Sequence, residues 1–313
     1  MSPDTARTRR AGVGYAAAAY LSWGLFPLYF RALKGVPAPE VLAHRITWSA
    51  AFLVIVVTAL RRWPQVLRLV RSPRTLAALA ASAVFISTNW LVYIWAVNAG
   101  HVLEASLGYF VNPIVTVLLG VVFLRERLGR RQRAAVALAA AGVLVLVVRA
   151  GRVPWVALAL AVTFGLYGLV RKQVRADAVD GLLVEVGLLA PIALAFQGVL
   201  ATSGTSQFSA TLRFTLLLAA SGIVTAMPLI WFANAVARLR LSTVGILQYL
   251  NPTAQLAIAV FLFGEAFTVT HALAFGCIWA ALALYSQAVL RPGEAARSGG
   301  AGLVGRQAPR PPR

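Results

Sequence analysis

The residues of this 313-residue chain that could do chemistry are ionisable side chains set inside long apolar stretches. Glu185, His44 and Arg45 are the candidates, because a charged group in a hydrocarbon environment is costly to keep. A proton could be exchanged at Glu185 or His44, so these residues are candidates for coupling a movement of protons to another process. Two alternatives stay open: Arg45 could extend its head to a polar interface, and Glu185 could be a hydrogen-bonded structural group.

A second candidate set consists of aromatic and amide side chains. Asn89 and Tyr93 share one helix face at four-residue spacing, and Tyr109 and Asn112 share another at three. Such a mixture suits a semi-polar or amphipathic small molecule, although packing is the alternative for any single aromatic residue. The cavity candidates are Trp23, Tyr29, Asn89, Tyr93, Asn98, Tyr109, Asn112, Tyr167, Asn234, Gln248 and Asn251, with Phe26 and Trp90 beside them.

Two prolines, Pro113 and Pro252, each lie near the middle of an apolar stretch. Proline lacks an N–H and clashes with the carbonyl four residues before it, so we predict helix breaks that free the carbonyls of Tyr109 and Gln248. Freed carbonyls inside a membrane must face protein or a water-filled cavity. The alternative is a kink that serves packing alone.

The elements that must position these residues are membrane-spanning helices. Hydrophobic residues make up 60% of the chain, charged residues only 12%, and the mean hydropathy is +0.78. Roughly 20 apolar residues in a helix cross the hydrocarbon of a bilayer. The sequence predicts an all-α integral membrane protein with ten such helices, at 11–31, 39–60, 75–98, 102–124, 132–149, 153–171, 181–200, 212–236, 241–263 and 268–290.

The positive charges predict how these helices point. Most of the 29 lysines and arginines fall in alternate loops and in the two terminal segments. Because positive charge collects on the cytoplasmic side, both termini are predicted to be cytoplasmic. Residues 1–10 are expected to be a cytoplasmic tail and 291–313 a disordered one. A cleaved signal peptide at the N-terminus is disfavoured, since the apolar run is too long.

An internal repeat decides the architecture. Residues 109–126 read YFVNPIVTVLLGVVFLRE and residues 248–265 read QYLNPTAQLAIAVFLFGE, so the Asn-Pro pairs align and each is followed at equal distance by Glu126 or Glu265. WGLFPLYF at 23–30 similarly matches FGLYGLVR at 164–171. Five helices per repeat predict two halves of opposite orientation, 11–150 and 151–290, as in many secondary transporters. Chance similarity between apolar helices is the alternative.

Several function classes are disfavoured by what the sequence lacks. There is no phosphate-binding P-loop, no G-x-S-x-G nucleophile turn and no Cys/His metal spacing. We therefore expect no enzyme activity, no cofactor and no metal. The net charge of +20 is explained by membrane topology, so no nucleic-acid partner is expected.

The segments EVLAHRITWS (40–49), STNWLVYIWAVNAGHVLEASLGYFVNP (87–113) and STVGILQYLNP (242–252), with those at 23–30 and 164–172, closely resemble RarD-type permeases of the EamA group in the drug/metabolite transporter superfamily. The resemblance covers about residues 11–290. It implies ten helices in two EamA repeats and a plasma-membrane permease, with export as the expected direction. The family is associated by name with chloramphenicol sensitivity, and no substrate is carried over. Small multidrug relatives couple protons through a glutamate in the first helix, but 11–31 has none.

We therefore expect a multi-pass cell-membrane transporter that moves a small metabolite or drug-like molecule by alternating access, with proton coupling left open. Its partners would be this small molecule and the lipid bilayer, and the protein would be a monomer or homodimer. The alternative is a non-transporting membrane scaffold or sensor, whose polar groups hold helices together.

Overall fold

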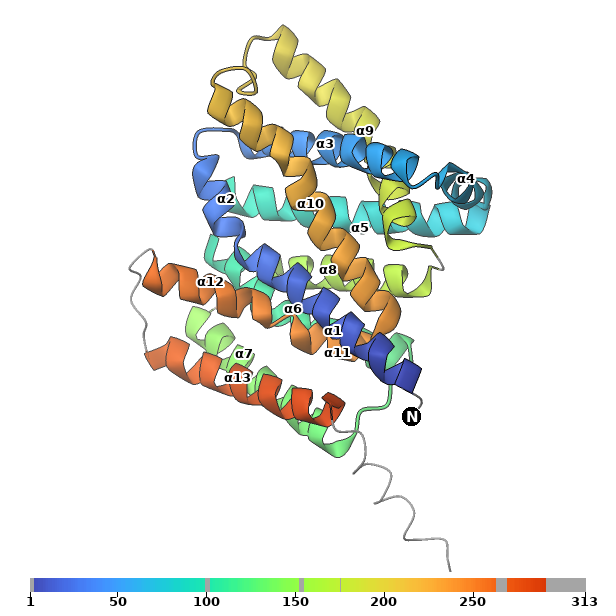
Figure 1. Ribbon diagram of the computed structural model, residues 1–313. Helices are drawn as coiled ribbons and strands as arrows, with labels where there is room; N and C mark the ends of the chain where they lie inside the picture. The colour runs from blue at the N-terminus through green and yellow to red at the C-terminus, as the bar shows by residue number, and fades with distance from the viewer. Residues whose placement is uncertain (1–2, 99–101, 152–154, 175, 263–268, 291–313) are drawn as a thin grey trace, which may run out of the picture.

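The computed structural model describes residues 3–98, 102–151, 155–174, 176–262 and 269–290, and within these ranges the chain is helical with no strand (Figure 1). The helices are α1 (Pro3–Gly24), α2 (Phe26–Ala32), α3 (Ala38–Ala59), α4 (Trp63–Arg71), α5 (Pro73–Asn98), α6 (Val102–Phe123), α7 (Arg130–Ala150), α8 (Trp155–Gln173), α9 (Ala178–Thr202), α10 (Leu212–Arg238), α11 (Leu241–Leu247), α12 (Leu250–Phe261) and α13 (Val269–Leu290). The tail expected at 291–313 and Glu265 lie outside the described residues.

Eight helical segments of the described chain are long and apolar enough to cross a membrane, and residues 107–123 of α6 form a shorter apolar helix. Nine of the ten predicted stretches are thereby accounted for. The tenth, 11–31, is divided between α1 and α2, which break at Leu25. Pro27 explains this break, because its ring excludes the carbonyl four residues before it. The helix α1 begins at Pro3, so most of the expected N-terminal tail is helical.

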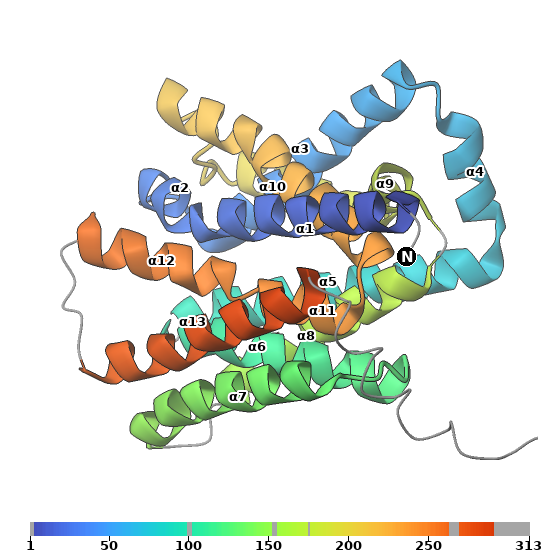
Figure 2. The same cartoon turned by 60° about the horizontal axis from the view of Figure 1, so that its bottom comes forward.

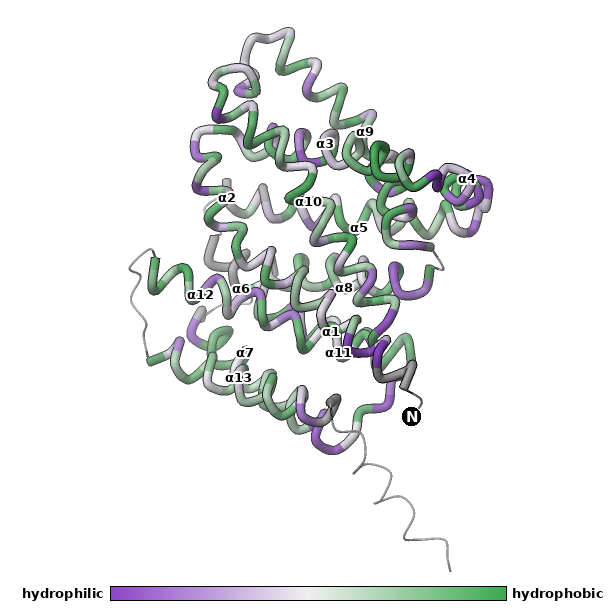
Figure 3. Tube along the Cα trace, viewed as in Figure 1, coloured by the Kyte–Doolittle hydropathy of each residue, from purple (hydrophilic) through white to green (hydrophobic). Residues whose placement is uncertain are grey.

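The long helices run between two ends of the bundle. We call the end where the chain begins the N-terminal end, and the opposite one the far end. Figures 1 and 2 show α1 running from the N-terminal end to the far end, and α8 running the other way. The short helix α4 crosses the N-terminal end between α3 and α5. Hydrophobic residues fill the middle of the bundle, and many hydrophilic ones gather around α4 and the start of α1 (Figure 3).

Two clusters of buried side chains make up most of the described core, and three smaller ones lie beside them. The larger surrounds Tyr20, Leu53 and Phe232, and joins α1, α3, α5, α8, α9 and α10. The smaller joins α6, α7, α11 and α13 through alanines such as Ala139 and Ala281. At Gly142 an added Cβ would lie 2.8 Å from the carbonyl oxygen of Ala274, so α7 and α13 touch backbone to backbone.

The outer surface of the bundle is apolar. Ile192 is 71% exposed and Phe261 is 88% exposed, and many leucines and valines are also exposed. Water-soluble proteins rarely expose such a continuous apolar surface. The protein is therefore a multi-pass membrane protein whose helices face lipid.

Candidate functional site

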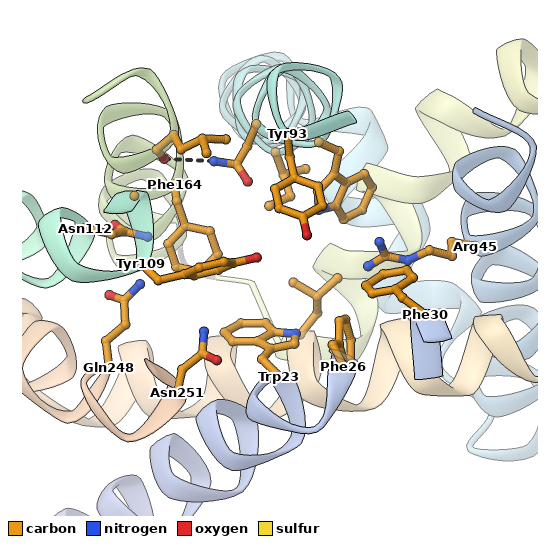
Figure 4. Close-up of a pocket in the computed structure, with 16 residues that line it drawn as sticks. Trp23, Phe26, Phe30, Arg45, Tyr93, Tyr109, Asn112, Phe164, Gln248 and Asn251 are labelled. Atoms are coloured by element: carbon orange, nitrogen blue, oxygen red, sulfur yellow. Dashed lines mark hydrogen bonds between the residues drawn. The ribbon is translucent and has the colours of Figure 1, made fainter. Parts of the chain in front are cut away.

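A cavity of about 110 Å³ lies at the centre of the bundle, where both predicted halves contribute to its walls (Figure 4). It is lined by Trp23, Phe26, Phe30, Arg45, Ile86, Asn89, Trp90, Tyr93, Gly108, Tyr109, Asn112, Leu160, Phe164, Leu229, Gln248 and Asn251. Ligand sites in proteins usually have volumes of roughly 300–1,000 Å³, so this cavity alone is smaller than most of them.

One side of the cavity is formed by three amide side chains, Asn112, Gln248 and Asn251, which we call the amide group (Figure 4). Asn112 comes from α6, and the other two come from the junction where α11 ends at Leu247 and α12 begins at Leu250. A helix break four residues before Pro252 places Gln248 in this junction. The backbone carbonyl of Gln248 is not free, however, because it accepts the N–H of Asn251 at 3.0 Å.

The amide group retains hydrogen-bonding capacity. The Oδ1 atom of Asn112 accepts the hydroxyl of Thr116 at 3.4 Å, and Oδ1 of Asn251 accepts Nε2 of Gln255 at 2.9 Å. Gln248 is only 3% exposed, and within the described chain its Oε1 atom has no hydrogen-bond partner. A buried acceptor without a partner costs free energy, and a ligand donor would offset that cost.

Aromatic rings form the walls between the two sides of the cavity. The rings of Trp23 and Phe164 meet edge to face with centroids 5.6 Å apart, and those of Tyr93 and Tyr109 do so at 6.4 Å. Figure 4 shows the hydroxyls of both tyrosines directed toward the interior of the cavity. The walls therefore offer apolar faces together with two hydroxyl groups.

Arg45 occupies the side opposite the amide group (Figure 4). Its Nε atom donates to the hydroxyl of Thr225 at 2.9 Å, and its guanidinium lies 5.2 Å from the ring centroid of Trp90 and 5.6 Å from that of Phe26. Arg45 is the one charged residue in the cavity lining, and no described carboxylate lies within ion-pair distance of it. Counted at 1.5 Å per residue, it lies about 12 Å along α3 from the N-cap.

A second cavity, of about 240 Å³, continues from the first toward the far end of the bundle. The two share Phe30, Arg45, Trp90 and Tyr93, and the second adds the turn between α2 and α3, including Lys34. Arg45 thus lies where the central cavity meets a wider approach from the far end.

At the N-terminal end, polar contacts link neighbouring helices. The carboxylate of Glu126 accepts the backbone N–H groups of Leu241 at 2.6 Å and Ser242 at 3.0 Å, and Arg240 lies 3.7 Å away. Lys172 on α8 donates to the carbonyl of Val236 at 2.8 Å. We call Glu126, Lys172, Arg240 and Ser242 the N-terminal closure.

Glu185 and His44 lie outside the cavity lining. Glu185 is 1% exposed and accepts the Ser82 hydroxyl at 2.6 Å, with Nη1 of Arg171 at 3.4 Å, so it joins α5, α8 and α9. His44 stacks on Phe208 with ring centroids 4.7 Å apart, near the link between α9 and α10.

Three other candidates also lie away from the cavity lining. Tyr29 donates its hydroxyl to the carbonyl of Leu217 at 2.8 Å. Tyr167 stacks on Phe232 in the larger core cluster. Asn234 donates to the carbonyl of Ile230 in its own helix at 2.9 Å. Each of these contacts joins or stiffens helices.

The remaining candidates are placed as follows. Asn89 lines the cavity, and its amide nitrogen donates to the Leu160 carbonyl at 2.8 Å and to the Thr163 hydroxyl at 2.9 Å. The side chain of Asn98 lies outside the described part of the chain. Pro113 sits inside α6, which continues through it, whereas Pro252 follows the junction of α11 and α12.

Sequence reasoning missed several apolar members of the lining, including Phe30 and Phe164. A signal for Phe164 was present, because the internal repeat aligns it with Trp23. The contact made by Glu126 was also missed, although the repeat had singled out this glutamate by its spacing from Pro113.

Comparison with known proteins places the chain among membrane transporters. Residues 10–148 match the model of the EamA-like transporter family. An "Uncharacterized transporter" of Vibrio cholerae is 45% identical over 95% of this chain and 98% of its own, and "Protein RarD" of Salmonella typhi is 47% identical over 90% and 96%. A "Chloramphenicol-sensitive protein RarD" of Pseudomonas aeruginosa is 34% identical over 87% and 92%.

The fold also matches a solved structure. One crystal structure, described only as that of a protein, superposes with a TM-score of 0.69 over 91% of this chain and 99% of its own, at 21% sequence identity. At this level of identity, the match supports the fold alone.

Proposed function

The chain belongs to the EamA-like transporter family, in the branch that contains RarD proteins, and on that premise we propose that it is a secondary transporter of a small organic molecule. Transport would occur by alternating access, in which the central cavity opens first to one end of the bundle and then to the other. The contacts at the two ends of the bundle support this mechanism.

The observation that carries the proposal is the difference between the two ends. From the central cavity, a second cavity leads toward the far end, whereas the N-terminal closure joins α6, α8, α10 and α11 across the other end. The closure consists of a few hydrogen bonds and one ion pair near the surface. Such contacts can be exchanged for contacts with water at modest cost, as a gate requires.

The symmetry and orientation belong to the same proposal. We take residues 11–150 and 151–290 as two inverted repeats, and the opposite directions of α1 and α8 support this division. The arginine-rich links at the N-terminal end favour a cytoplasmic location for that end. Substrate would enter there and leave at the far end, so the proposed direction is export.

We propose that Glu185 is not a proton-coupling group. It lies outside the cavity lining and is held by Ser82 and Arg171 in the interior of the bundle. His44 is likewise occupied by packing against Phe208 and lies 4.0 Å from Glu40. Transport would then be facilitated diffusion or exchange.

Flux from liposomes that contain the purified protein tests the proposal. A panel of organic acids, amino acids, chloramphenicol and cationic dyes would be followed with and without a pH gradient, for the wild type, Asn112→Ala and Glu185→Gln. We expect flux of at least one compound, independent of the gradient, and a loss of flux in Asn112→Ala with an unchanged melting temperature. A scaffold would instead lose stability in Asn112→Ala and show no flux for any compound.

A further inference from the structure

The central cavity contains an unbalanced positive charge. Arg45 has no carboxylate partner among the described residues, and the rest of the lining is neutral. Keeping an arginine near the middle of a membrane helix costs about 2.5–3.5 kcal/mol on insertion scales. Elsewhere in the same bundle a buried arginine is paired, since Arg171 meets Glu185 at 3.4 Å. A charge kept without a partner in a cavity indicates that the partner is the ligand.

The guanidinium of Arg45 is oriented but not saturated. Its one described hydrogen bond, to Thr225, uses Nε and fixes the plane of the group. The rings of Phe26, Phe30 and Trp90 surround it with centroids 5.2–5.8 Å away, which stabilises the cation without using its N–H donors. The two terminal nitrogens can therefore donate side by side to a planar anion, and a carboxylate fits this fork.

The opposite side of the cavity offers a hydrogen-bond acceptor, which suits a donor group on the same ligand. Gln248 is 3% exposed, and its Oε1 atom is an acceptor without a partner in the described chain. Two other amides, Asn112 and Asn251, lie beside it on this side of the cavity. A hydroxyl or N–H on the ligand would satisfy this oxygen. Between the two sides, the rings of Trp23, Phe164 and Tyr109 offer flat apolar surface.

We propose that the cavity binds a small organic carboxylate with an aromatic or similarly flat apolar body and a hydrogen-bond donor at its other end. The carboxylate pairs with Arg45, the body lies between the aromatic rings, and the donor reaches the amide group. Lys34, in the wall of the second cavity, adds positive charge on the path to the far end. This assignment of substrate class rests on the proposed function.

Three probes with the same ring and hydroxyl but different charge test the assignment: 4-hydroxyphenylacetate, its neutral amide and the cationic tyramine. Binding to the purified full chain would be measured by calorimetry near pH 7.5, where the acid is ionised. We expect the acid to bind about tenfold or more tightly than the amide, since a charge-assisted pair contributes that much, and tyramine to bind weakest.

Three variants locate the effect. Arg45→Gln should weaken binding of the acid about tenfold or more while leaving the amide within about twofold, because only the ionic partner is removed. Arg45→Lys keeps the charge but loses the two parallel N–H donors of the guanidinium. Its affinity for the acid should lie between those of the wild type and Arg45→Gln. Arg68→Gln on the exposed face of α4 makes the same change in net charge and should alter nothing. If Arg45→Gln does not fold, Arg45→Lys still shows whether a change at this position weakens binding of the acid more than binding of the amide.

Equal or tighter binding of the amide or tyramine by the wild type, unchanged affinity for the acid in Arg45→Gln, or no binding of any probe by the folded wild type would each overturn the assignment. The failure of the proposed function looks different. In liposomes, flux of neutral or cationic compounds without acid binding would leave a transporter of another substrate class. Binding of the acid without flux of any compound would leave the carboxylate site without the transporter.

Discussion

Arg45 and Glu185 occupy comparable places in α3 and α9, the helices that correspond to one another in the two proposed repeats. Each lies eight residues after the N-cap of its helix, Pro37 for α3 and Asp177 for α9. Arg45 faces two connected cavities, whereas Glu185 is 1% exposed and meets Arg171 and Ser82. The same position is thus open in one half and packed in the other.

The difference shows that a buried charge can serve either stability or binding, and that its partners decide which. In the second half, the charge is compensated within the chain and joins three helices. In the first half, the compensation is left to a ligand. Because the halves are proposed to be inverted, the open one faces the far end and the packed one faces the N-terminal end.

The largest expected effect comes from breaking the packed half. Glu185→Ala leaves Arg171 buried without its partner, which should destabilise the protein by about 3–5 kcal/mol. The measurement is the thermal unfolding midpoint in detergent. The matched control is the double variant Glu185→Leu with Arg171→Met, which removes both charges and should recover much of the loss. Equal losses in the single and double variants would contradict the pairing.

Loosening the N-terminal closure should have the next largest effect. Glu126→Gln places an amide donor against the backbone N–H groups of Leu241 and Ser242, so at least one hydrogen bond to a charged acceptor is lost. We expect about 1.5–3 kcal/mol of destabilisation, read from the same thermal midpoint. Arg127→Gln, which changes an exposed side chain nearby, serves as the control. An unchanged midpoint in Glu126→Gln would show that the closure contributes no stability.

Disturbing the close packing between α3 and α10 should cause an intermediate loss of stability. At Gly222 an added Cβ would overlap the backbone of Trp48, and Ser49 donates to the Gly222 carbonyl at 3.1 Å. Gly222→Ala should therefore destabilise by about 1–3 kcal/mol. Gly198→Ala on α9 meets no atom within 4 Å and should be neutral or stabilising, so equal midpoints for the two variants would contradict the contact.

The smallest effect on stability should come from Arg45 itself. Arg45→Met removes a cation that has no described carboxylate partner. The free energy of unfolding should therefore stay within about 1 kcal/mol of the wild-type value or rise, as judged from the thermal unfolding midpoint. This outcome is the opposite of that expected for Glu185→Ala. A loss as large as the one at Glu185 would show that Arg45 is structural and would end the contrast between the halves.

Much of the helical framework could be predicted from sequence, because apolar runs and their flanking charges are local signals. The prediction was less accurate for helix breaks. Pro252 is preceded by the junction of α11 and α12, but α6 continues through Pro113, and the break at Leu25 beside Pro27 was missed. A proline shows where a hydrogen bond is lost, whereas the surrounding helices determine whether the chain bends or breaks there.

The cavity could be predicted only in outline. Most of the aromatic and amide residues that line it were among the candidates, because polar groups on apolar helices are conspicuous. The different surroundings of Arg45 and Glu185 could not be predicted. Glu185 is packed because it contacts Ser82 and Arg171, which belong to other helices. Sequence gives the depth of a residue along its own helix, but the neighbours across the bundle come from tertiary packing.

The central claim is that the cavity opens at the far end while the N-terminal closure holds the other end shut. Phe164→Cys, in a chain whose single native cysteine, Cys277, is replaced by serine, places a thiol in the cavity wall. In membrane vesicles of each orientation, a membrane-impermeant thiol reagent should label it only from the far end. Addition of Glu126→Gln should permit labelling from the N-terminal end as well. Labelling of the Phe164→Cys protein from the N-terminal end alone, or no change on adding Glu126→Gln, would contradict the account.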